Sequence, residues 1–169
     1  DFNNFTRMAT IVPVTEKLFM FLCFLYCSSS FKSLNLEWIE AFFKIEQEDL
    51  NILMDPRGYV IDKGGEIFFA KHEDVVIGTS AMVLISPGIY ELAKMAVTKK
   101  FQGKGVGRML MEASLEFARN NHAKEVFLVT NDKLLPALEL YKSSGFILDK
   151  NYDDNRYDRG NTKLKLKLN

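Results

Sequence analysis

The sequence predicts an α/β fold in which helices cover a β-sheet, and three observations lead to that class. The glycine-rich turn 102–107 (QGKGVG) separates an apolar, strand-like run from a segment whose apolar residues have helical spacing. Residues 125–130 are almost continuously apolar, which is typical of a strand with helices on both faces. Residues 163–168 alternate lysine and leucine, the pattern of a strand with one buried and one wet face.

Composition narrows the class of protein. The chain has 169 residues, of which 47% are hydrophobic and 26% charged, and this balance favours one soluble globular domain. Its formal net charge of zero gives no electrostatic reason to expect nucleic acid or an anionic membrane as a partner. The only cysteines are Cys23 and Cys27, and the two histidines lie far from them in sequence. We therefore expect no metal site and two reduced thiols in a cytoplasmic protein.

The N-terminal part leaves one question open. Residues 1–7 precede Met8 and are interpreted as a leader or an expression remnant, so a single domain is expected over 8–169. The β-branched run 10–14 suits a first strand. Residues 18–27 are nearly all apolar but too few for a membrane-spanning helix, which needs about 20 such residues. They fit a buried first helix, an insertion or part of a signal peptide.

The remaining elements follow in order along the chain. Helical spacing over 31–54, broken near 47–49, predicts two helices that end at the turn 55–58. Apolar runs separated by turn residues predict strands, and Pro136 and Gly145 suit the beginning and the end of a late helix. We expect strands at 66–70, 75–84 and 89–97, a helix at 106–121, a strand at 125–130, a helix from 136 to 145, and strands at 146–148 and 162–168.

The turn 102–107 has the chemistry of an anion site. Glycines let a ligand approach the backbone, and a helix that starts behind them offers free N–H groups and the positive end of its dipole. A P-loop would end in Gly-Lys-Ser/Thr, and a dinucleotide fingerprint would need glycine where Arg108 stands. The turn is therefore either a phosphate cradle of another kind or a tight turn without a ligand.

Two motifs of the chain resemble one known family. Gln102, Gly105 and Gly107, placed after a strand, form the pattern Gln-x-x-Gly-x-Gly, which resembles the acetyl-CoA loop of the GNAT N-acetyltransferases. The segment 137–146 adds the family's Ala-x-x-x-Tyr and Gly-Phe on the next helix, and the order of elements from about residue 10 is also similar. The resemblance implies the GNAT fold, a mixed, largely antiparallel sheet with a splayed parallel pair, flanked by helices.

The resemblance also implies how acetyl-CoA, as co-substrate, is held. Its pyrophosphate would lie over the amides of the glycine turn, with Lys104 and Arg108 adding positive charge. The preceding strand would offer backbone groups of Met95 and Val97 to the pantetheine arm, and the Val97 N–H would polarise the thioester carbonyl. Asn131 is either a polar contact at this site or a helix cap. The expected contacts are Met95, Val97, Gln102, Gly103, Lys104, Gly105, Val106, Gly107, Arg108 and Asn131.

Two residues are candidates for proton transfer. Tyr141 matches the family's tyrosine that protonates the departing thiolate, and its alternative role is a tyrosine packed under the loop. Glu91 stands six residues before Val97, where some family members have a general base, and its alternative role is a salt bridge. Strand alternation would put every second residue from Glu91 to Val97 on one face, so Glu91 could reach the amine only through water.

The resemblance implies an N-acetyltransferase that moves an acetyl group from acetyl-CoA to a primary amine by direct attack in a ternary complex. The alternatives are a degenerate GNAT domain that binds acyl-CoA as a sensor without turnover, and an interaction protein without a co-substrate. The sequence does not identify the acceptor, which is a small-molecule amine or a peptide amine, and it does not indicate the oligomeric state. The substrate side is expected at 34–54 and 150–161.

Overall fold

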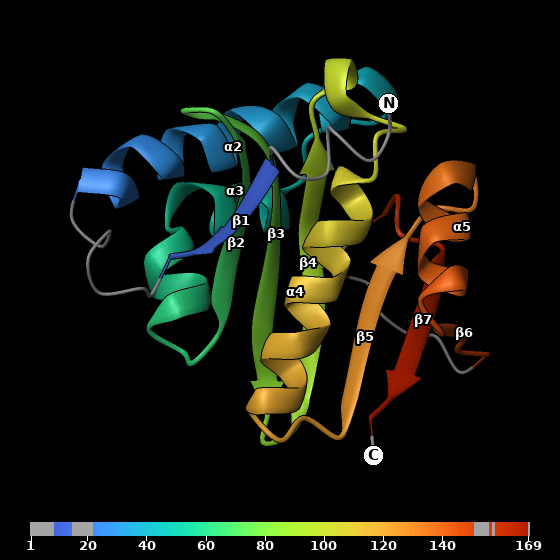
Figure 1. Ribbon diagram of the computed structural model, residues 1–169. Coiled ribbons are helices and arrows are strands. Elements are labelled where there is room, and N and C mark those ends of the chain that lie inside the picture. The colour runs from blue at the N-terminus through green and yellow to red at the C-terminus, as the bar shows by residue number, and fades with distance from the viewer. Residues whose placement is uncertain (1–8, 15–21, 151–155, 157, 169) are drawn as a thin grey trace.

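The computed structural model describes residues 9–14, 22–150, 156 and 158–168, and for 22–27 it describes the backbone only. The expected leader at 1–7 lies outside these residues. The centre of the fold is a seven-stranded sheet with the order β1-β2-β3-β4-β5-β7-β6 (Figure 1).

The helices and strands have the following bounds. The strands are β1 (Ala9–Pro13), β2 (Glu66–His72), β3 (Val75–Ser86), β4 (Ile89–Val97), β5 (Glu125–Thr130), β6 (Ile147–Leu148) and β7 (Thr162–Lys167). The helices are α2 (Leu22–Phe42), α3 (Gln47–Met54), α4 (Val106–Asn120) and α5 (Leu135–Ser143), with a π-helical turn η1 (Arg57–Ile61) and a 3-10 turn η2 (Lys99–Phe101).

The sheet changes character between β4 and β5. Strands β1 to β4 form an antiparallel meander, whereas β4 and β5 are parallel. Their pairing runs only from Ile89–Glu125 to Glu91–Phe127, and beyond these residues the two strands diverge (Figure 1). β7 lies antiparallel to β5 and completes the sheet with β6. The splayed pair is thus the place where the sheet opens.

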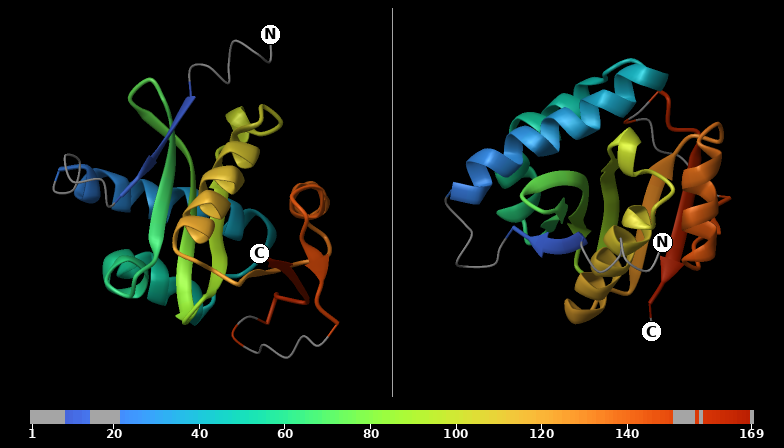
Figure 2. Two further views of the ribbon diagram at one scale, coloured as in Figure 1. Left: turned by 60° about the horizontal axis from the view of Figure 1, so that its bottom comes forward. Right: turned by 45° about the horizontal axis from the view of Figure 1, so that its top comes forward.

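Helices cover the two faces of the sheet, with α4 on one and α2 and α3 on the other (Figure 2). Two neighbouring residues of β2 show how one strand serves both layers. Phe68 packs edge-on against Phe117 of α4, with ring centroids 6.0 Å apart, and Phe69 packs against Phe31 of α2 at 6.5 Å. Burial of apolar surface on both sides, here called the α4-face core and the α2-face core, stabilises this arrangement.

The N-terminal helical region differs from the expectation. Of the apolar run 18–27, residues 22–27 form the first turns of α2, and 18–21 lie outside the described residues. α2 continues to Phe42, so the break falls at 43–46 and not at 47–49. The break is earlier because Glu46 and Asp49 form a capping box at the start of α3, in which the Glu46 N–H donates to the Asp49 carboxylate at 3.0 Å.

The other predicted elements are confirmed, with shifts of a few residues at their ends. The predicted turn 55–58 continues as η1, whose π-helical form the sequence did not reveal. Within the described ranges, no helix is long and apolar enough to cross a bilayer.

β4 contains a bulge at Lys94. Ala93 pairs with Ala81 and Ala96 pairs with Thr79, so β4 has one residue more than β3 between these pairs. Lys94 takes a positive φ of 50°, a backbone conformation that a lysine adopts only when its surroundings hold it there.

The bulge corrects the expected alternation along β4. Ala93 packs in the α2-face core, and Glu91, two residues earlier, points to the same side. Met95 and Val97 pack in the α4-face core instead. The prediction that Glu91 and Val97 share one face is therefore wrong, because the extra residue shifts the alternation by one.

Candidate functional site

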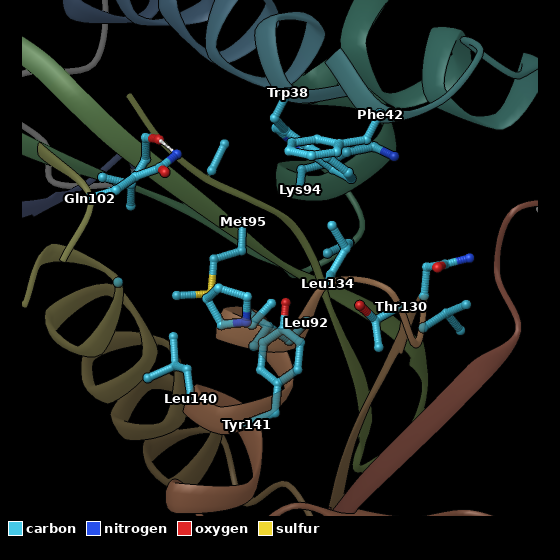
Figure 3. Close-up of a pocket in the computed structure, with 18 of the residues that line it drawn as sticks. Trp38, Phe42, Leu92, Lys94, Met95, Gln102, Thr130, Leu134, Leu140 and Tyr141 are labelled. Carbon is cyan, nitrogen blue, oxygen red and sulfur yellow. Dashed lines mark hydrogen bonds between the residues drawn. The ribbon is translucent and has the colours of Figure 1, made fainter. Parts of the chain in front are cut away.

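A cavity of about 380 Å³ lies where β4 and β5 diverge. Its walls come from the end of α2, from β4, from the glycine turn, from the residues after β5, and from α5 (Figure 3). The predicted site residues that line it are Glu91, Met95, Val97, Gln102, Gly103, Gly107, Asn131 and Tyr141. The four others, Lys104, Gly105, Val106 and Arg108, lie in the glycine turn or the first turn of α4 but outside the lining.

The glycine turn has the backbone of an anion cradle. Gly103 and Gly105 have φ of 72° and 83°, and Gly105 is the N-cap of α4. The first N–H groups of a helix have no partner within it, so those of α4 are available to a ligand. A Cβ on Gly103 would meet nothing within 4 Å, so the outer side of the turn is open. Lys104 and Arg108 are exposed beside it. These features fit a pyrophosphate.

Gly107 and Val106 have a packing role in addition. A Cβ on Gly107 would stand 3.3 Å from Cδ2 of Leu140 and 3.8 Å from Cε of Met95. Glycine at 107 therefore lets α4 approach α5 closely at the floor of the cavity. The Val106 side chain is buried in the α4-face core, so only its backbone can face a ligand.

Hydrogen bonds fix the orientation of Val97. The Thr98 N–H donates to the Ile77 carbonyl at 2.9 Å, so Thr98 points its backbone groups toward β3. In an antiparallel ladder the neighbouring residue points the other way, which directs the Val97 N–H and carbonyl toward the splay. The Gln102 side chain donates to that Val97 carbonyl at 2.9 Å (Figure 3). Gln102 thus fixes the end of β4, and the Val97 N–H faces the cavity.

Tyr141 rises from α5 at the floor of the cavity, and its hydroxyl points inward (Figure 3). Its ring packs against Phe146, with centroids 6.3 Å apart. Burial raises the pKa of Tyr141 to about 12, so the phenol stays protonated at neutral pH.

Asn131 lines the cavity, and its side-chain amide forms hydrogen bonds with backbone groups. Its Oδ1 accepts from the Lys133 N–H at 3.0 Å, and its Nδ2 donates to the Arg159 carbonyl at 2.7 Å. Asn131 therefore stabilises the turn that leads into α5 and links this turn to the segment before β7. This role resembles the helix cap that was the predicted alternative for Asn131.

Glu91 is buried and held by a salt bridge. Its carboxylate accepts two bonds from the Arg156 guanidinium, at 2.8 and 3.2 Å. The predicted alternative of a salt bridge is thus present, with an arginine as the partner. A carboxylate oxygen has two lone pairs, so each oxygen keeps one for water or a substrate proton.

A buried ionic cluster beside the cavity was not predicted. Asp49 of α3 accepts from Lys94 Nζ at 2.8 Å and from the Arg159 guanidinium at 2.6 and 2.7 Å. Arg159 also donates to Glu46 at 2.8 Å. Asp49 and Lys94 are almost completely buried. The cluster joins α3, the bulge of β4 and the segment before β7, and Lys94 and Arg159 both line the cavity.

The pKa of Asp49 and the pKa of Lys94 both lie below their usual values. Burial alone would raise the pKa of Asp49, but the hydrogen bonds from Arg159 and the charge of Lys94 outweigh it and hold that pKa below its usual value. Burial lowers the pKa of Lys94, and the carboxylate of Asp49 opposes this.

A signal for the cluster existed in the sequence. Lys94 stands among apolar residues in the second half of a central strand, where an unpaired ammonium would be costly. Its partner could not be identified, because Asp49 lies 45 residues away and Arg159 a further 65 beyond Lys94.

Comparisons with known proteins agree with this geometry. The model of the Acetyltransferase (GNAT) family matches residues 28–146. The chain is 26% identical over 126 residues to the uncharacterized N-acetyltransferase YvbK of Bacillus subtilis, an alignment that covers 68% of this chain and 81% of that protein. It is 32% identical over 95 residues to human N-acetyltransferase 8B, covering 53% of this chain but only 42% of the relative. The chain therefore spans less than half the length of the human protein.

Solved structures show the same fold. A GNAT acetyltransferase of Staphylococcus aureus Mu50 has a TM-score of 0.79 at 18% identity, over 95% of this chain and 99% of that one. The acetyltransferase yncA of Salmonella typhimurium, solved with acetyl-CoA, has a TM-score of 0.69 at 18% identity, over 96% and 95% of the two chains. The mixed sheet with a splayed parallel pair, expected from the resemblance, is confirmed.

Proposed function

We propose that this chain, which belongs to the GNAT acetyltransferase family, is an N-acetyltransferase that transfers the acetyl group of acetyl-CoA to a primary amine by direct attack. The observation that carries this proposal is the convergence of three features on one cavity. These are the open glycine turn, the Val97 N–H at the end of β4, and the Tyr141 hydroxyl on α5.

The residues of the cavity divide the binding of acetyl-CoA between them. The amides at the start of α4 would hold the pyrophosphate, with Lys104 and Arg108 beside them. The backbone of Met95 and Val97 would hold the pantetheine arm along the open edge of β4. The lack of a side chain at Gly107 supports this path, because a Cβ there would stand only 3.3 Å from Leu140 Cδ2.

The Val97 N–H is the proposed oxyanion contact. When the amine nitrogen attacks, the carbonyl oxygen of the thioester gains negative charge, and an N–H aimed at it lowers the barrier by about 3 kcal/mol. The hydrogen bond from Gln102 to the Val97 carbonyl supports this role, because it fixes the peptide group before the substrate arrives.

Tyr141 is the proposed acid. As the nitrogen–carbon bond forms and the carbon–sulfur bond breaks, the sulfur leaves as a thiolate, and the phenol hydroxyl faces the cavity in which that charge develops. With a pKa of about 12, the phenol is a weaker acid than a thiol, whose pKa is about 8.5. We therefore expect Tyr141 to stabilise the thiolate mainly as a hydrogen-bond donor.

Glu91 is the proposed proton acceptor for the substrate ammonium, acting through water, so that the neutral amine can attack. The position of Glu91 on the α2 side of β4 supports an approach of the acceptor from that side. Arg156 uses one lone pair of each carboxylate oxygen, which leaves the others for the relay.

The proposal is tested by two measurements on the same protein. Calorimetry measures acetyl-CoA binding, and release of free thiol from acetyl-CoA measures turnover across amines, amino acids and peptides. Binding with amine-dependent thiol release is the expected result. Binding without turnover for any acceptor would support a sensor domain, and the absence of binding would refute the co-substrate itself.

A further inference from the structure

We propose that the acceptor is a primary amine with an apolar, ring-bearing substituent, which packs against Trp38, Phe42 and Phe43 at the end of α2. These three residues are called the aromatic wall. The inference rests on the proposed function, because it names the substrate class of the same cavity.

The aromatic wall lies on the side of the cavity away from the glycine turn. All three of its residues line the cavity, and Trp38 and Phe42 project into it from α2 (Figure 3). Phe43 packs against Trp38 and Phe42 with ring centroids 6.3 and 6.4 Å away. α2, which carries Trp38 and Phe42, covers the face of the sheet opposite α4, the helix that follows the glycine turn (Figure 2).

The exposure of the wall favours an apolar occupant. Phe42 lines the cavity, and 67% of its surface is exposed to solvent. A ring placed against it would remove apolar surface from water on both partners, and edge-to-face or offset contacts between rings add to that gain. Leu134, just before α5, adds another apolar side chain to the lining of the cavity.

The charged residues around the cavity also favour an acceptor with an apolar substituent. Among the described residues of the lining, the charged side chains are Glu91, Lys94 and Arg159, and each has an opposite charge beside it. Glu91 is bound by Arg156, and both Lys94 and Arg159 are bound by Asp49. A carboxylate or a second ammonium on the acceptor would have to compete with these buried pairs. An apolar substituent meets the wall without such competition.

The chain offers a direct probe, because Trp38 is its only tryptophan. In the presence of CoA, addition of 2-phenylethylamine should change the Trp38 fluorescence and reach saturation, whereas ethanolamine, 1,4-diaminobutane and glutamate should leave it unchanged at the same concentrations. In the thiol-release assay, kcat/KM for 2-phenylethylamine should exceed that of the three polar amines by about tenfold or more.

Two variants separate the wall from general apolar surface. Phe42→Ala should raise the concentration of 2-phenylethylamine that gives half of the fluorescence change by about tenfold. Ile85→Ala removes a side chain of similar exposure, 47%, which lies outside the cavity lining, and should leave that concentration unchanged.

The outcomes distinguish the inference from the proposed function. Turnover that is equal for all amines, or higher for a polar one, overturns the inference and leaves the acetyltransferase activity standing. Absence of turnover with every amine counts against the proposed function, and the fluorescence titration then decides the inference alone. A titration that gives no saturation with 2-phenylethylamine, or the same midpoint in Phe42→Ala, overturns it.

Discussion

Asp49→Asn should lower the free energy of unfolding by about 3–5 kcal/mol, because it breaks a buried ion pair and removes the carboxylate charge from beside Lys94 and Arg159. The structure gives the reason for a value in this range. The Asp49 side chain has no exposed surface and accepts from Lys94 at 2.8 Å and from Arg159 at 2.6 Å. The Lys94 side chain is only 4% exposed, so water cannot replace the lost carboxylate. Domains are stable by about 5–15 kcal/mol in total, so this loss should be evident.

Urea unfolding followed by Trp38 fluorescence and circular dichroism measures the change. Asp62→Asn is the matched control, because it removes the same charge from a pair with Arg57 at 3.3 Å whose side chains are 56% and 64% exposed. That control should change the free energy of unfolding by less than about 1 kcal/mol. If Asp49→Asn lowers the free energy of unfolding by as little as Asp62→Asn does, the cluster does not stabilise the fold and does not hold the bulge.

The pH dependence of this loss has a definite sign. Asp49 has a lowered pKa in the folded protein, so its carboxylate stabilises the fold fully above the ordinary pKa of about 3.9. As the pH falls through the lowered folded value, that contribution is lost. The difference in unfolding free energy between the wild type and Asp49→Asn should therefore be constant near neutral pH and shrink below about pH 4.

Three further predictions concern the cavity. Gly105→Val should weaken acetyl-CoA binding by about tenfold or more in calorimetry, whereas Gly88→Val, at a glycine with a similar φ of 79° outside the cavity, should not. Tyr141→Phe should lower kcat more than it raises KM for acetyl-CoA, and the wild-type kcat should show no alkaline loss from this phenol below about pH 10, because burial raises its pKa to about 12. Glu91→Gln should lower kcat/KM by about 10²-fold, and an unchanged kcat/KM would leave Glu91 as the salt-bridge partner of Arg156 alone.

Much of the fold could be predicted because its signals are local. The apolar run 125–130 coincides with β5, since a strand covered on both faces needs no polar residue in its interior. The glycine turn and Tyr141 were singled out separately, and the structure brings both to one cavity because α4 and α5 flank the splayed strands. Each of these signals depends on the residue types themselves and on their spacing.

What could not be predicted depends on residues far apart in sequence. The bulge at Lys94 is defined by the pairing of β4 with β3, and no pattern within β4 indicates it. Strand alternation therefore placed Glu91 and Val97 on one face, whereas the structure separates them. The start of α3 was missed by a few residues for a related reason, because Asp49 serves at once as a capping residue and as the partner of Lys94 and Arg159.

The bulge explains why a stabilising cluster lies next to a candidate catalytic centre. Before Lys94, β4 directs Glu91 toward α2 and the aromatic wall, and after it β4 directs the Met95 and Val97 side chains toward α4. In the proposed mechanism the acceptor lies on one side of this strand and acetyl-CoA on the other, and the break in alternation directs side chains to both sides. A non-glycine residue at positive φ costs about 1–3 kcal/mol, and the bonds of Lys94 to Asp49 offset that cost. In the proposed mechanism we therefore expect Asp49 to support the position of the Val97 N–H through Lys94, and loss of Asp49 should lower kcat even under conditions in which the variant remains folded.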